Sequence, residues 1–359
     1  MIPVTKPFQP PLDEYFELLK GIWERQWFTN NGPLVIELQK KLNDFLGTNN
    51  MLFLGNGTIA LQIAIKALGI KGEILTTPFS YVATTSSIVW EGCKPVFVDI
   101  DENTFNIDPQ KIESKITKKT KAILATHCFG NPCDVEAIDK ISNKYGLKVI
   151  YDAAHCFGTK YMGESIFKWG DISTTSFHAT KLFHTIEGGA VFTKNEELFK
   201  KMIHQRNFGH DGPDKFNGVG INGKNSEFHA AMGILNLNYI DQILTSRKNQ
   251  VAFYDKMLSN VKIKKPKIDP KVDFNNAYYP IVFETHEVMM RVKKSLELKE
   301  IFPRRYFYPS LSSLNYIKKQ ETPVSDDIAS RILCLPLFFE LSELEIEMIC
   351  RIILKTLNN

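Results

Sequence analysis

The sequence predicts an α/β protein built on a mostly parallel, seven-stranded sheet. Short β-rich runs recur between residues 51 and 193 and alternate with segments of helical periodicity. Most of these runs are apolar throughout, as is typical of strands that helices cover on both faces of a sheet. At 359 residues the chain can also form a second core, and we expect a smaller α+β domain after the sheet.

The expected elements follow one another in a regular order. Prolines precede an aromatic helix that holds Trp23 and Trp27, and we expect residues 1–40 to pack across both domains. Helices are expected over 58–68 and 135–145, because each apolar pattern ends just before a glycine. The seven strands are expected at 51–54, 73–77, 95–98, 122–126, 149–151, 172–177 and 190–193.

After about Gly223 the pattern changes to long helices and then to an α+β region. We therefore predict a boundary near residue 245, with a large domain over 1–245 and a smaller one over 246–359. The C-terminal pattern predicts two long helices, a Lys/Pro-rich stretch, a strand and two further helices, at 226–235, 239–258, 262–270, 277–283, 288–298 and 343–357.

Composition and charge argue against nucleic-acid and membrane partners. The 44 basic and 40 acidic residues give a net charge of +4 and are spread along the chain. We interpret the Lys-rich runs at 118–121 and 262–265 as solvated faces. The N-terminus lacks a basic segment before an apolar core, and no apolar run approaches the ~18 residues of a membrane span. We expect a soluble, cytoplasmic protein.

The cysteines are scattered without paired short spacing. Their apolar surroundings are typical of buried thiols. Cys128 and Cys133, with His127 beside them, would be the only candidate metal ligands, but 129–132 has the composition of a loop and no second ligand pair exists. We therefore expect no metal. The six cysteines are Cys93, Cys128, Cys133, Cys156, Cys334 and Cys350.

An acid and a lysine fall at the ends of two successive expected strands. Asp152 ends the buried run 149–152, and Lys181 follows the next strand. A lysine can form an imine with the aldehyde of pyridoxal phosphate, and an acid can keep the pyridine nitrogen of that cofactor protonated. The alternatives are a structural carboxylate that caps a following helix and a solvated surface lysine. Together, the two residues predict a pyridoxal phosphate site.

A phosphate could bind where the first strand meets the next helix. The segment 56–58 is Asn-Gly-Thr, so backbone amides and the Thr58 hydroxyl lie at the positive end of a helix dipole. Ser176 supplies a second hydroxyl at the same sheet edge. A simple helix N-cap is the alternative interpretation of the tripeptide.

Aromatic and histidine side chains complete the predicted site. Tyr81 follows the second strand and could lie against a planar ring, although Tyr81 or Phe79 could instead be core residues. His155 lies three residues after the acid, one turn along an expected helix, and could reach the same ligand. His178 and His184 are interpreted as supporting residues or substrate contacts.

Taken together, these motifs resemble the DegT/DnrJ/EryC1/StrS family of sugar aminotransferases, which use pyridoxal phosphate and have the type I aminotransferase-like fold. The resemblance covers nearly the whole chain, and so many ordered matches make chance unlikely to explain it. The matching segments are 27–33, 55–58, 78–84, 152–155, 170–171, 176–181, 187–189, 220–222 and 335–337.

The resemblance implies a role for each cofactor contact. Lys181 would be the Schiff-base lysine and proton shuttle, Asp152 would contact the ring nitrogen, and His155 the ring hydroxyl. Tyr81 would stack on the ring. The phosphate would be held by Gly57, Thr58 and Ser176.

The resemblance also implies a homodimer with shared active sites, because Asn222 would reach the phosphate in the neighbouring subunit. The family often carries Arg two residues after this Asn, whereas this chain has Lys224, so a bidentate contact is in doubt there. Candidate sugar and diphosphate contacts are Thr29, Lys224, Tyr306 and Tyr308, with Arg304 or Arg305 for phosphate charge.

The resemblance further implies a two-stage amino transfer. L-Glutamate would convert the cofactor to pyridoxamine 5'-phosphate, and a nucleotide-linked keto sugar would take up the amine. The segments 30–33, 93–99 and 183–189 resemble the subgroup that converts dTDP-4-keto-6-deoxy-D-glucose to dTDP-4-amino-4,6-dideoxy-D-glucose, on the viosamine route. Lys181 argues against the dehydratase branch, which has His at that position.

Three alternative functions are also considered from the sequence. One is an aminotransferase that acts on dTDP-3-keto-6-deoxyhexose or on a UDP-linked keto sugar, because C3 and C4 enzymes share the same cofactor motifs. Another is a regulator that binds pyridoxal phosphate without turnover, although no spare DNA-binding region of ~60 residues is present. A metal-dependent hydrolase lacks a ligand cluster.

Overall fold

A seven-stranded sheet forms the centre of the larger lobe in the computed structural model, which describes residues 1–358. β10 runs antiparallel to both of its neighbours, and the other strand pairs are parallel. The predicted α/β class and mostly parallel sheet are therefore confirmed. In spatial order the strands are β2 (Met51–Leu54), β10 (Gly189–Phe192), β9 (Ile172–Ser176), β6 (Lys148–Asp152), β5 (Thr120–Thr126), β3 (Glu73–Thr76) and β4 (Lys94–Phe97).

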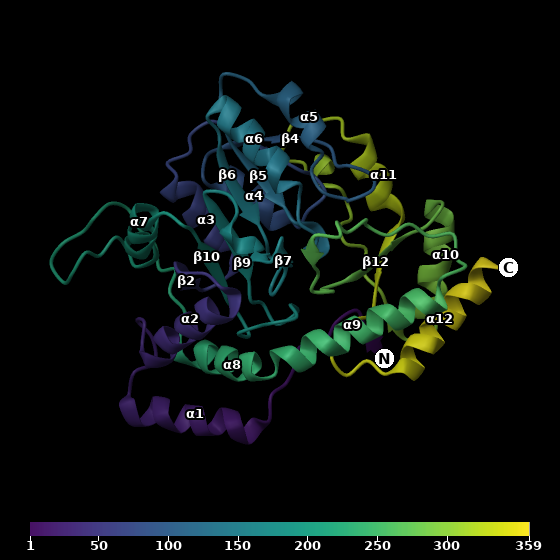
Figure 1. The fold of residues 1–359 in the computed structure, drawn as a ribbon, viewed down its shortest axis with the longest axis horizontal. Coiled ribbons are helices and arrows are strands. Elements are labelled where there is room, and N and C mark those ends of the chain that lie inside the picture. The colour runs from purple at the N-terminus through teal and green to yellow at the C-terminus, as the bar shows by residue number, and fades with distance from the viewer. Residues whose placement is uncertain (359) are drawn as a thin grey trace.

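Helices pack on both faces of this sheet (Figure 1). Along β2, Met51 and Phe53 enter one core cluster, whereas Leu52 and Leu54 enter the other. Successive side chains of a strand point to opposite faces, so a strand that is apolar at every position requires a helix layer on each side. The helices of this lobe are α2 (Pro33–Leu46), α3 (Gly57–Ala67), α4 (Val82–Trp90), α6 (Val135–Tyr145), α7 (Glu196–Arg206) and α8 (Glu227–Asn238).

Short elements connect the strands and helices of the larger lobe. β11 pairs with β7, and β7 with β8, in a small antiparallel sheet. A long loop over 207–222 follows α7 and projects from the body of the molecule (Figure 1). The short elements are α5 (Pro109–Ile112), η1 (Glu113–Lys115), η2 (Cys128–Gly130), β7 (Lys160–Tyr161), β8 (Glu164–Ser165), η3 (Ile166–Lys168) and β11 (Val272–Asp273).

The smaller lobe is an α+β unit with its own core. β12 pairs antiparallel with β14, and helices α10 and α12 pack on that pair. The N-terminal strand β1 pairs in parallel with β13, which brings the first residues of the chain into this lobe. The elements are β1 (Ile2–Pro3), β12 (Tyr279–Val282), α10 (His286–Glu297), β13 (Ile301–Phe302), η4 (Leu311–Ser313), α11 (Pro323–Arg331), β14 (Ile332–Leu335) and α12 (Glu343–Leu357).

Helix α9 (Ile240–Met257) carries the chain from one lobe to the other (Figure 1). Ile240 packs in a core cluster of the larger lobe, and Tyr254 packs in the core of the smaller one. The predicted boundary near residue 245 falls inside this continuous helix, and the division at that residue stays a prediction. The N-terminal segment ends in α1 (Leu12–Arg25), which packs on α8.

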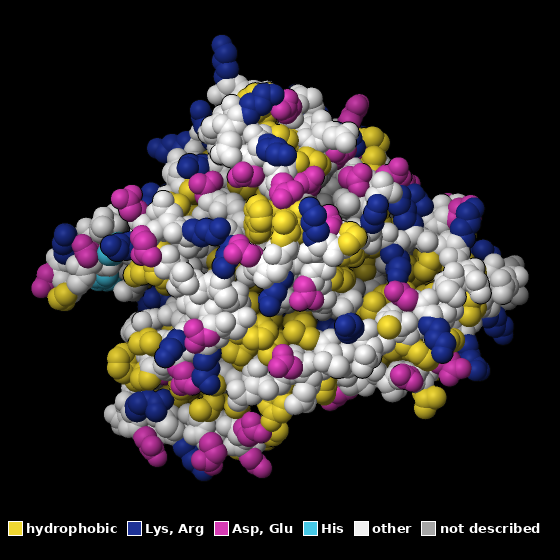
Figure 2. Space-filling view, viewed as in Figure 1, with side chains coloured by type: hydrophobic (Ala, Val, Ile, Leu, Met, Phe, Trp, Pro, Cys, Tyr) yellow, Lys and Arg dark blue, Asp and Glu magenta, His cyan; other side chains and the backbone are white. Residues whose placement is uncertain are grey.

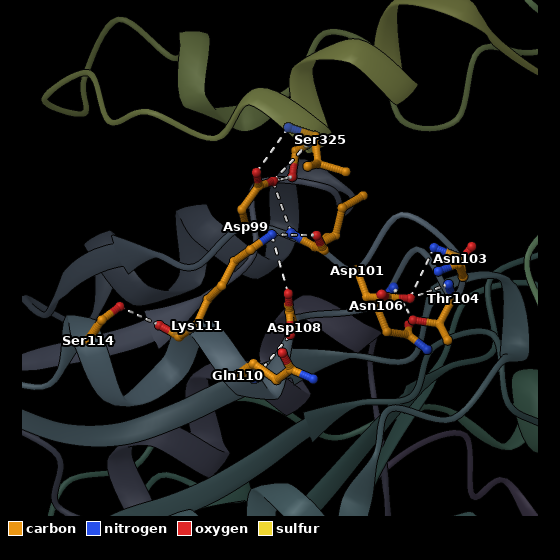
Figure 3. Close-up of polar contacts among 12 residues, drawn as sticks. Asp99, Asp101, Asn103, Thr104, Asn106, Asp108, Gln110, Lys111, Ser114 and Ser325 are labelled. Atoms are coloured by element: carbon orange, nitrogen blue, oxygen red, sulfur yellow. Dashed lines mark hydrogen bonds and ion pairs between the residues drawn. The ribbon is translucent and has the colours of Figure 1, made fainter.

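The loop over 99–108 joins the end of β4 to the smaller lobe. The Asp99 carboxylate accepts hydrogen bonds from the backbone N–H groups of Val324 and Ser325 and from the Ser325 hydroxyl, at 2.6–2.9 Å. Figure 3 shows Asp99 directly beneath Ser325 in the first turn of α11. Asp99 therefore provides acceptors for N–H groups that would otherwise have no partner at the start of this helix.

The exposed charges form no single-sign field on the face drawn in Figure 2, where basic and acidic side chains are interspersed. All six cysteines are free and buried, as predicted. Residues 1–358 contain no helix that is long and apolar enough to cross a membrane. Over the same residues, no group of three or more His, Cys, Asp or Glu side chains is placed to hold a metal ion.

Candidate active site

A cavity of about 530 Å³ lies at the carboxyl ends of the parallel strands, where side chains of both lobes meet. Open α/β sheets bind ligands at this edge. Its walls come from the β2–α3 turn, the start of α4, the ends of β6 and β9, and the smaller lobe. The lining residues include Gly57, Thr58, Ser80, Tyr81, Thr126, Asp152, His155, Ser176, His178, Lys181, Glu187, Tyr278, Arg304, Tyr306 and Phe307.

Asp152 is the last residue of β6 and is 7% exposed. Its carboxylate accepts hydrogen bonds from the Thr84 hydroxyl at 2.7 Å and from the Ala154 backbone N–H at 3.2 Å. Burial raises the pKa of Asp152, while these two donors and the nearby Lys181 amine lower it. The two groups that donate to the Asp152 carboxylate are both neutral. The buried negative charge of Asp152 can therefore be matched by a cationic or N–H group of a ligand.

His155 lines the cavity, and its ring is fixed in direction. The chain makes turns over 154–158, so the expected helix after Asp152 is wrong. The Phe129 backbone N–H donates to Nδ1 of His155 at 3.1 Å, which assigns the proton of the neutral ring to Nε2. Burial lowers the pKa of His155 well below its usual range, and the Lys181 charge lowers it further. A neutral ring with a fixed Nε2–H can donate to a phenolic oxygen.

Lys181 lies in the loop between β9 and β10, and its side chain enters the cavity. The Nζ atom donates to the Tyr278 hydroxyl at 3.4 Å. Burial lowers the pKa of Lys181, and the negative charge of Asp152 raises it in part. An amine with a lowered pKa is available as a nucleophile or a base closer to neutral pH than a surface lysine is.

The turn between β2 and α3 approaches β9 so closely that only glycine fits at position 57. A Cβ there would lie 2.9 Å from the Ser176 Cβ atom. A Cβ on Gly189 would lie 2.7 Å from the Gly57 nitrogen. The Asn56 side chain caps α3 by accepting from the Ile59 N–H at 2.8 Å. Helix-terminal amides and two hydroxyls, of Thr58 and Ser176, therefore border one part of the cavity, as a phosphate requires.

Tyr81 lies at the start of α4 and is 61% exposed, although it also lines the cavity. Its ring is therefore available to a ligand, and the alternative of a core residue is wrong for Tyr81. Phe79 is completely buried and packs against Phe105, Phe129 and Phe307, as a core residue does.

Several predicted contacts do not line this cavity within one chain. Thr29 and Tyr308 are exposed and lie outside it, and Lys224 donates to the Asn207 side chain at 2.8 Å. Asn222 is exposed at the base of the projecting loop, where it is bridged to Asn207. Within a single chain Thr29, Lys224 and Tyr308 do not line the cavity, and their contact with a sugar nucleotide stays a prediction.

The two adjacent arginines have different surroundings. Arg304 lines the cavity beside Tyr306, whereas Arg305 donates to the Ser330 carbonyl at 2.8 Å and lies over the Tyr308 ring. His178 borders the cavity and pairs with Glu187 at 3.5 Å. His184 is buried and contacts the Phe8 carbonyl at 2.8 Å, so it supports the N-terminal segment.

Some residues in the cavity or directly behind it were not predicted from the sequence. Thr84 bonds Asp152, and Ser80 lies 2.7 Å from the Thr84 hydroxyl and 2.9 Å from that of Thr126. The position of Thr84, one helical turn into α4 after the predicted Tyr81, was a usable signal. Tyr278 and Phe307 come from the smaller lobe, and only tertiary structure brings them to the cavity.

The cavity fits pyridoxal phosphate in its donors and charges. A buried carboxylate with only neutral contact donors suits a pyridinium N–H, and the glycine-lined turn suits a phosphate. An accessible aromatic ring borders the same space, and a lysine amine with a lowered pKa reaches into it. These groups supply the chemistry of amino-group transfer or of another reaction that begins with proton removal next to an amine.

Comparison with known proteins places these observations in context. The model of the DegT/DnrJ/EryC1/StrS aminotransferase family matches residues 12–354. A dTDP-4-amino-4,6-dideoxy-D-glucose transaminase from Shigella dysenteriae is 45% identical over 346 residues, 94% of each chain. A transaminase of the same name from Escherichia coli is 38% identical over 95% of each chain. A crystal structure of DesI with its TDP-sugar product superposes with a TM-score of 0.94 at 28% identity and covers 99% of this chain and 93% of DesI.

Proposed function

The chain belongs to the DegT/DnrJ/EryC1/StrS aminotransferase family, and from this premise we propose that it aminates C4 of dTDP-4-keto-6-deoxy-D-glucose. L-Glutamate would be the amino donor and pyridoxal 5'-phosphate the cofactor. The observation that carries the proposal is the meeting of Lys181, Asp152 and His155 around one cavity in a chain 45% identical to a transaminase named for the corresponding amino sugar.

Each wall of the cavity would hold one part of the cofactor. Gly57, Thr58 and Ser176 would bind the phosphate, and Tyr81 would lie against the ring. Asp152 would accept a hydrogen bond from the pyridine nitrogen and keep it protonated, which would satisfy its own buried charge. His155 would donate from Nε2 to the ring hydroxyl. Bound pyridoxal phosphate would supply a carrier for the amino group and a sink for electrons.

Lys181 would move the proton that amino transfer requires. Its amine, with a pKa lowered by burial, would accept a proton from the carbon that gives up the amino group. It would then deliver that proton to the carbon that receives the amino group. The same amine would work in reverse for the keto sugar. Walls from both lobes would exclude water while the proton is held.

A homodimer with shared sites is also proposed. The loop 207–222 carries Asn222 and exposes apolar side chains, with Phe216 64% and Val219 75% exposed. A projecting loop with exposed apolar residues is typical of an arm that packs on a second subunit. Asn222, at the base of this loop, and Lys224, two residues further on, would then act in the site of the partner.

The first experiment is an absorbance spectrum of the purified protein. We expect a yellow protein whose colour bleaches when L-glutamate is added, and a colourless protein that cannot be loaded with the cofactor would contradict the proposal. Incubation with glutamate and either the 4-keto or the 3-keto dTDP sugar, followed by NMR of the product, then locates the new amine. An amine at C3 would favour the alternative substrate and leave the cofactor assignment intact.

A further inference from the structure

A tyrosine of the smaller lobe contacts the Lys181 amine. Nζ of Lys181 donates to the Tyr278 hydroxyl at 3.4 Å, and both side chains line the cavity. Tyr278 immediately precedes β12, whereas Lys181 follows β9 of the larger lobe. The contact therefore joins the two lobes at the amine that the proposed reaction uses.

Aromatic neighbours fix the direction of the Tyr278 ring. Its centroid lies 4.6 Å from that of His155, and its edge-to-face partners are Phe129 at 5.9 Å and Tyr306 at 5.7 Å. Rings that pack on several sides leave a phenol few rotamers. The hydroxyl of Tyr278 is thus aimed at the amine by packing, before any ligand binds.

The backbone at Tyr278 is tied to the loop that holds His155. The buried Asn275 side chain donates to the His155 carbonyl at 2.7 Å, and its oxygen accepts from the Ala277 N–H at 3.1 Å. The buried Arg247 guanidinium donates to the Ala277 carbonyl at 3.0 Å. One asparagine thereby sets the spacing between His155 and Tyr278 across the lobes.

We propose that Tyr278 is a positioning residue for the Lys181 amine during the stages in which that amine is free. Its neutral hydroxyl accepts an N–H of Lys181 and holds Nζ in the cavity with Asp152 and His155. The proton moves between the substrate carbon and Nζ, and Tyr278 neither gains nor loses one. This inference rests on the proposed function, since it assigns Lys181 as the proton carrier.

The hydrogen bond has a predictable effect on the amine. Burial raises the pKa of Tyr278, so the phenol stays neutral and can accept from the ammonium form of Lys181. This contact favours the protonated amine and opposes the lowering of the Lys181 pKa by burial. Removing the hydroxyl should therefore make the amine a weaker base and leave it less well placed.

The test compares Tyr278→Phe with Tyr279→Phe. The Tyr279 hydroxyl donates to Asp255 at 2.7 Å and its ring stacks on Tyr254, away from the cavity, which makes it a matched control. Competitive acetic anhydride labelling of the full-length, cofactor-free protein measures the titration of Lys181 by mass spectrometry. We expect Tyr278→Phe to lower the labelling midpoint of Lys181 by about one pH unit, and Tyr279→Phe to leave it unchanged.

Steady-state kinetics of the loaded enzyme gives the second measurement. Tyr278→Phe should reduce kcat about 10-fold to 100-fold with KM within about threefold, and it should shift the acidic limb of the kcat profile to lower pH. Tyr278→His keeps an aromatic ring with an acceptor nitrogen, so it should recover part of both effects. Circular dichroism would show whether Tyr278→Phe folds. If it does not fold, Tyr278→His is used for both the labelling and the kinetic measurements.

Each outcome decides the matter. An unchanged Lys181 midpoint in Tyr278→Phe overturns the proposal, because a loss of kcat alone would reflect altered packing. A shifted midpoint with wild-type kcat overturns it as well. The labelling experiment needs no turnover. If the wild-type protein made no amino sugar, the proposed function would be wrong, but the labelling midpoint of Lys181 could still be measured.

Discussion

At the scale of single residues, the site consists of ionisable groups whose neutral forms are favoured by burial. Burial raises the pKa of Asp152 and lowers those of Lys181 and His155, so each group is shifted toward its neutral form. Neighbours partly oppose the pKa shifts of Asp152 and Lys181, whereas the Lys181 charge lowers the pKa of His155 further. Groups whose proton affinities converge in this way exchange protons at lower cost than surface groups do.

The adjacent residues Thr84 and Thr85 allow a matched test of the support for Asp152. Both are completely buried, but the Thr84 hydroxyl donates to Asp152 whereas the Thr85 hydroxyl has no partner among residues 1–358. Thr84→Val removes a donor to a charged group, and we expect cofactor Kd to rise about tenfold. Thr85→Val should leave Kd unchanged and raise stability by about 1 kcal/mol. Cofactor titration and chemical denaturation measure the two effects, and equal Kd values would contradict the prediction.

His127 predicts how stability depends on pH. It is completely buried, stacks on Tyr151 and accepts from the Cys133 N–H at 2.9 Å, and burial lowers its pKa to about 3. The unfolded chain, with a histidine pKa of about 6.5, binds a proton that the folded chain does not bind between these values. The stability that neutral His127 contributes is therefore complete above pH ~6.5 and is lost as pH falls, by about 1.4 kcal/mol per unit.

The His127→Asn variant isolates this contribution, because its side-chain oxygen can still accept from the Cys133 N–H. Urea denaturation at pH 7 and pH 5 should show that wild type loses about 2 kcal/mol more than the variant between the two conditions. Equal losses would mean that His127 takes up its proton without unfolding. His155 and His184 are present in both proteins, so their effects cancel in the comparison.

At the scale of elements, the loop 99–108 shows how one carboxylate joins the lobes. Asp99 accepts three hydrogen bonds from the first turn of α11, whereas Asp101 in the same loop accepts only from the nearby Asn103 and Thr104 N–H groups (Figure 3). The two residues carry the same carboxylate group, but only one of them contacts a segment distant in the sequence. Only the first connects separate parts of the fold.

We expect Asp99→Ala to destabilise the protein by about 2 kcal/mol, because buried donors at the start of α11 lose their acceptor. Asp101→Ala should cost less than about 1 kcal/mol, because water can replace its local contacts. Thermal unfolding of the two variants gives the comparison. A larger loss for Asp101→Ala would show that the loop itself, and not its contact with α11, limits stability.

Element positions were predictable where a local pattern determines them. α6 and α12 have the predicted bounds, and the expected strands of the main sheet agree with the observed ones to within two residues. β6 extends one residue further than expected, so that Asp152 ends the strand itself. The helix expected after Asp152 is absent from the described chain, because the turns over 154–158 are held by long-range contacts such as those of Asn275.

At the scale of the whole molecule, the cavity needs both lobes. α9 links their cores, and the smaller lobe supplies Tyr278 and Arg304 to the cavity. The loop 207–222 projects from the body of the molecule (Figure 1), and Asn222 lies at its base, bridged to Asn207. A projecting loop of this kind can pack on a second subunit.

Mixing two variants that are both inactive at limiting cofactor concentration tests the shared site. Lys181→Ala should reduce turnover by more than about 10³-fold without unfolding the chain, because it removes the proton carrier. Asn222→Ala should weaken cofactor binding in the partner's site. Random reassociation of equal amounts gives hybrids in half of the dimers, each with one intact site, so about a quarter of wild-type activity should return.

Size-exclusion chromatography of each variant provides the control, since both must still associate. If no activity returns on mixing, Asn222 acts in its own chain or not at all. Mixing Lys181→Ala with Asp152→Ala should also restore nothing, because both residues line the same cavity of one chain and every hybrid site lacks one of them.

The sequence by itself determined the α/β class, the strand positions and the residues at the strand ends, among them Asp152, Lys181 and Gly57. These follow from local patterns, because apolar periodicity and the parallel sheet place strand ends at one edge whatever lies beyond it. Only the tertiary structure decided which distant side chains meet that edge. Tyr278, Phe307 and Arg304 are brought there by packing between the lobes, and Thr84 is selected over Thr85 by the direction in which α4 presents it. Contacts of long sequence separation depend on the free energy of the whole fold, and no local segment encodes them.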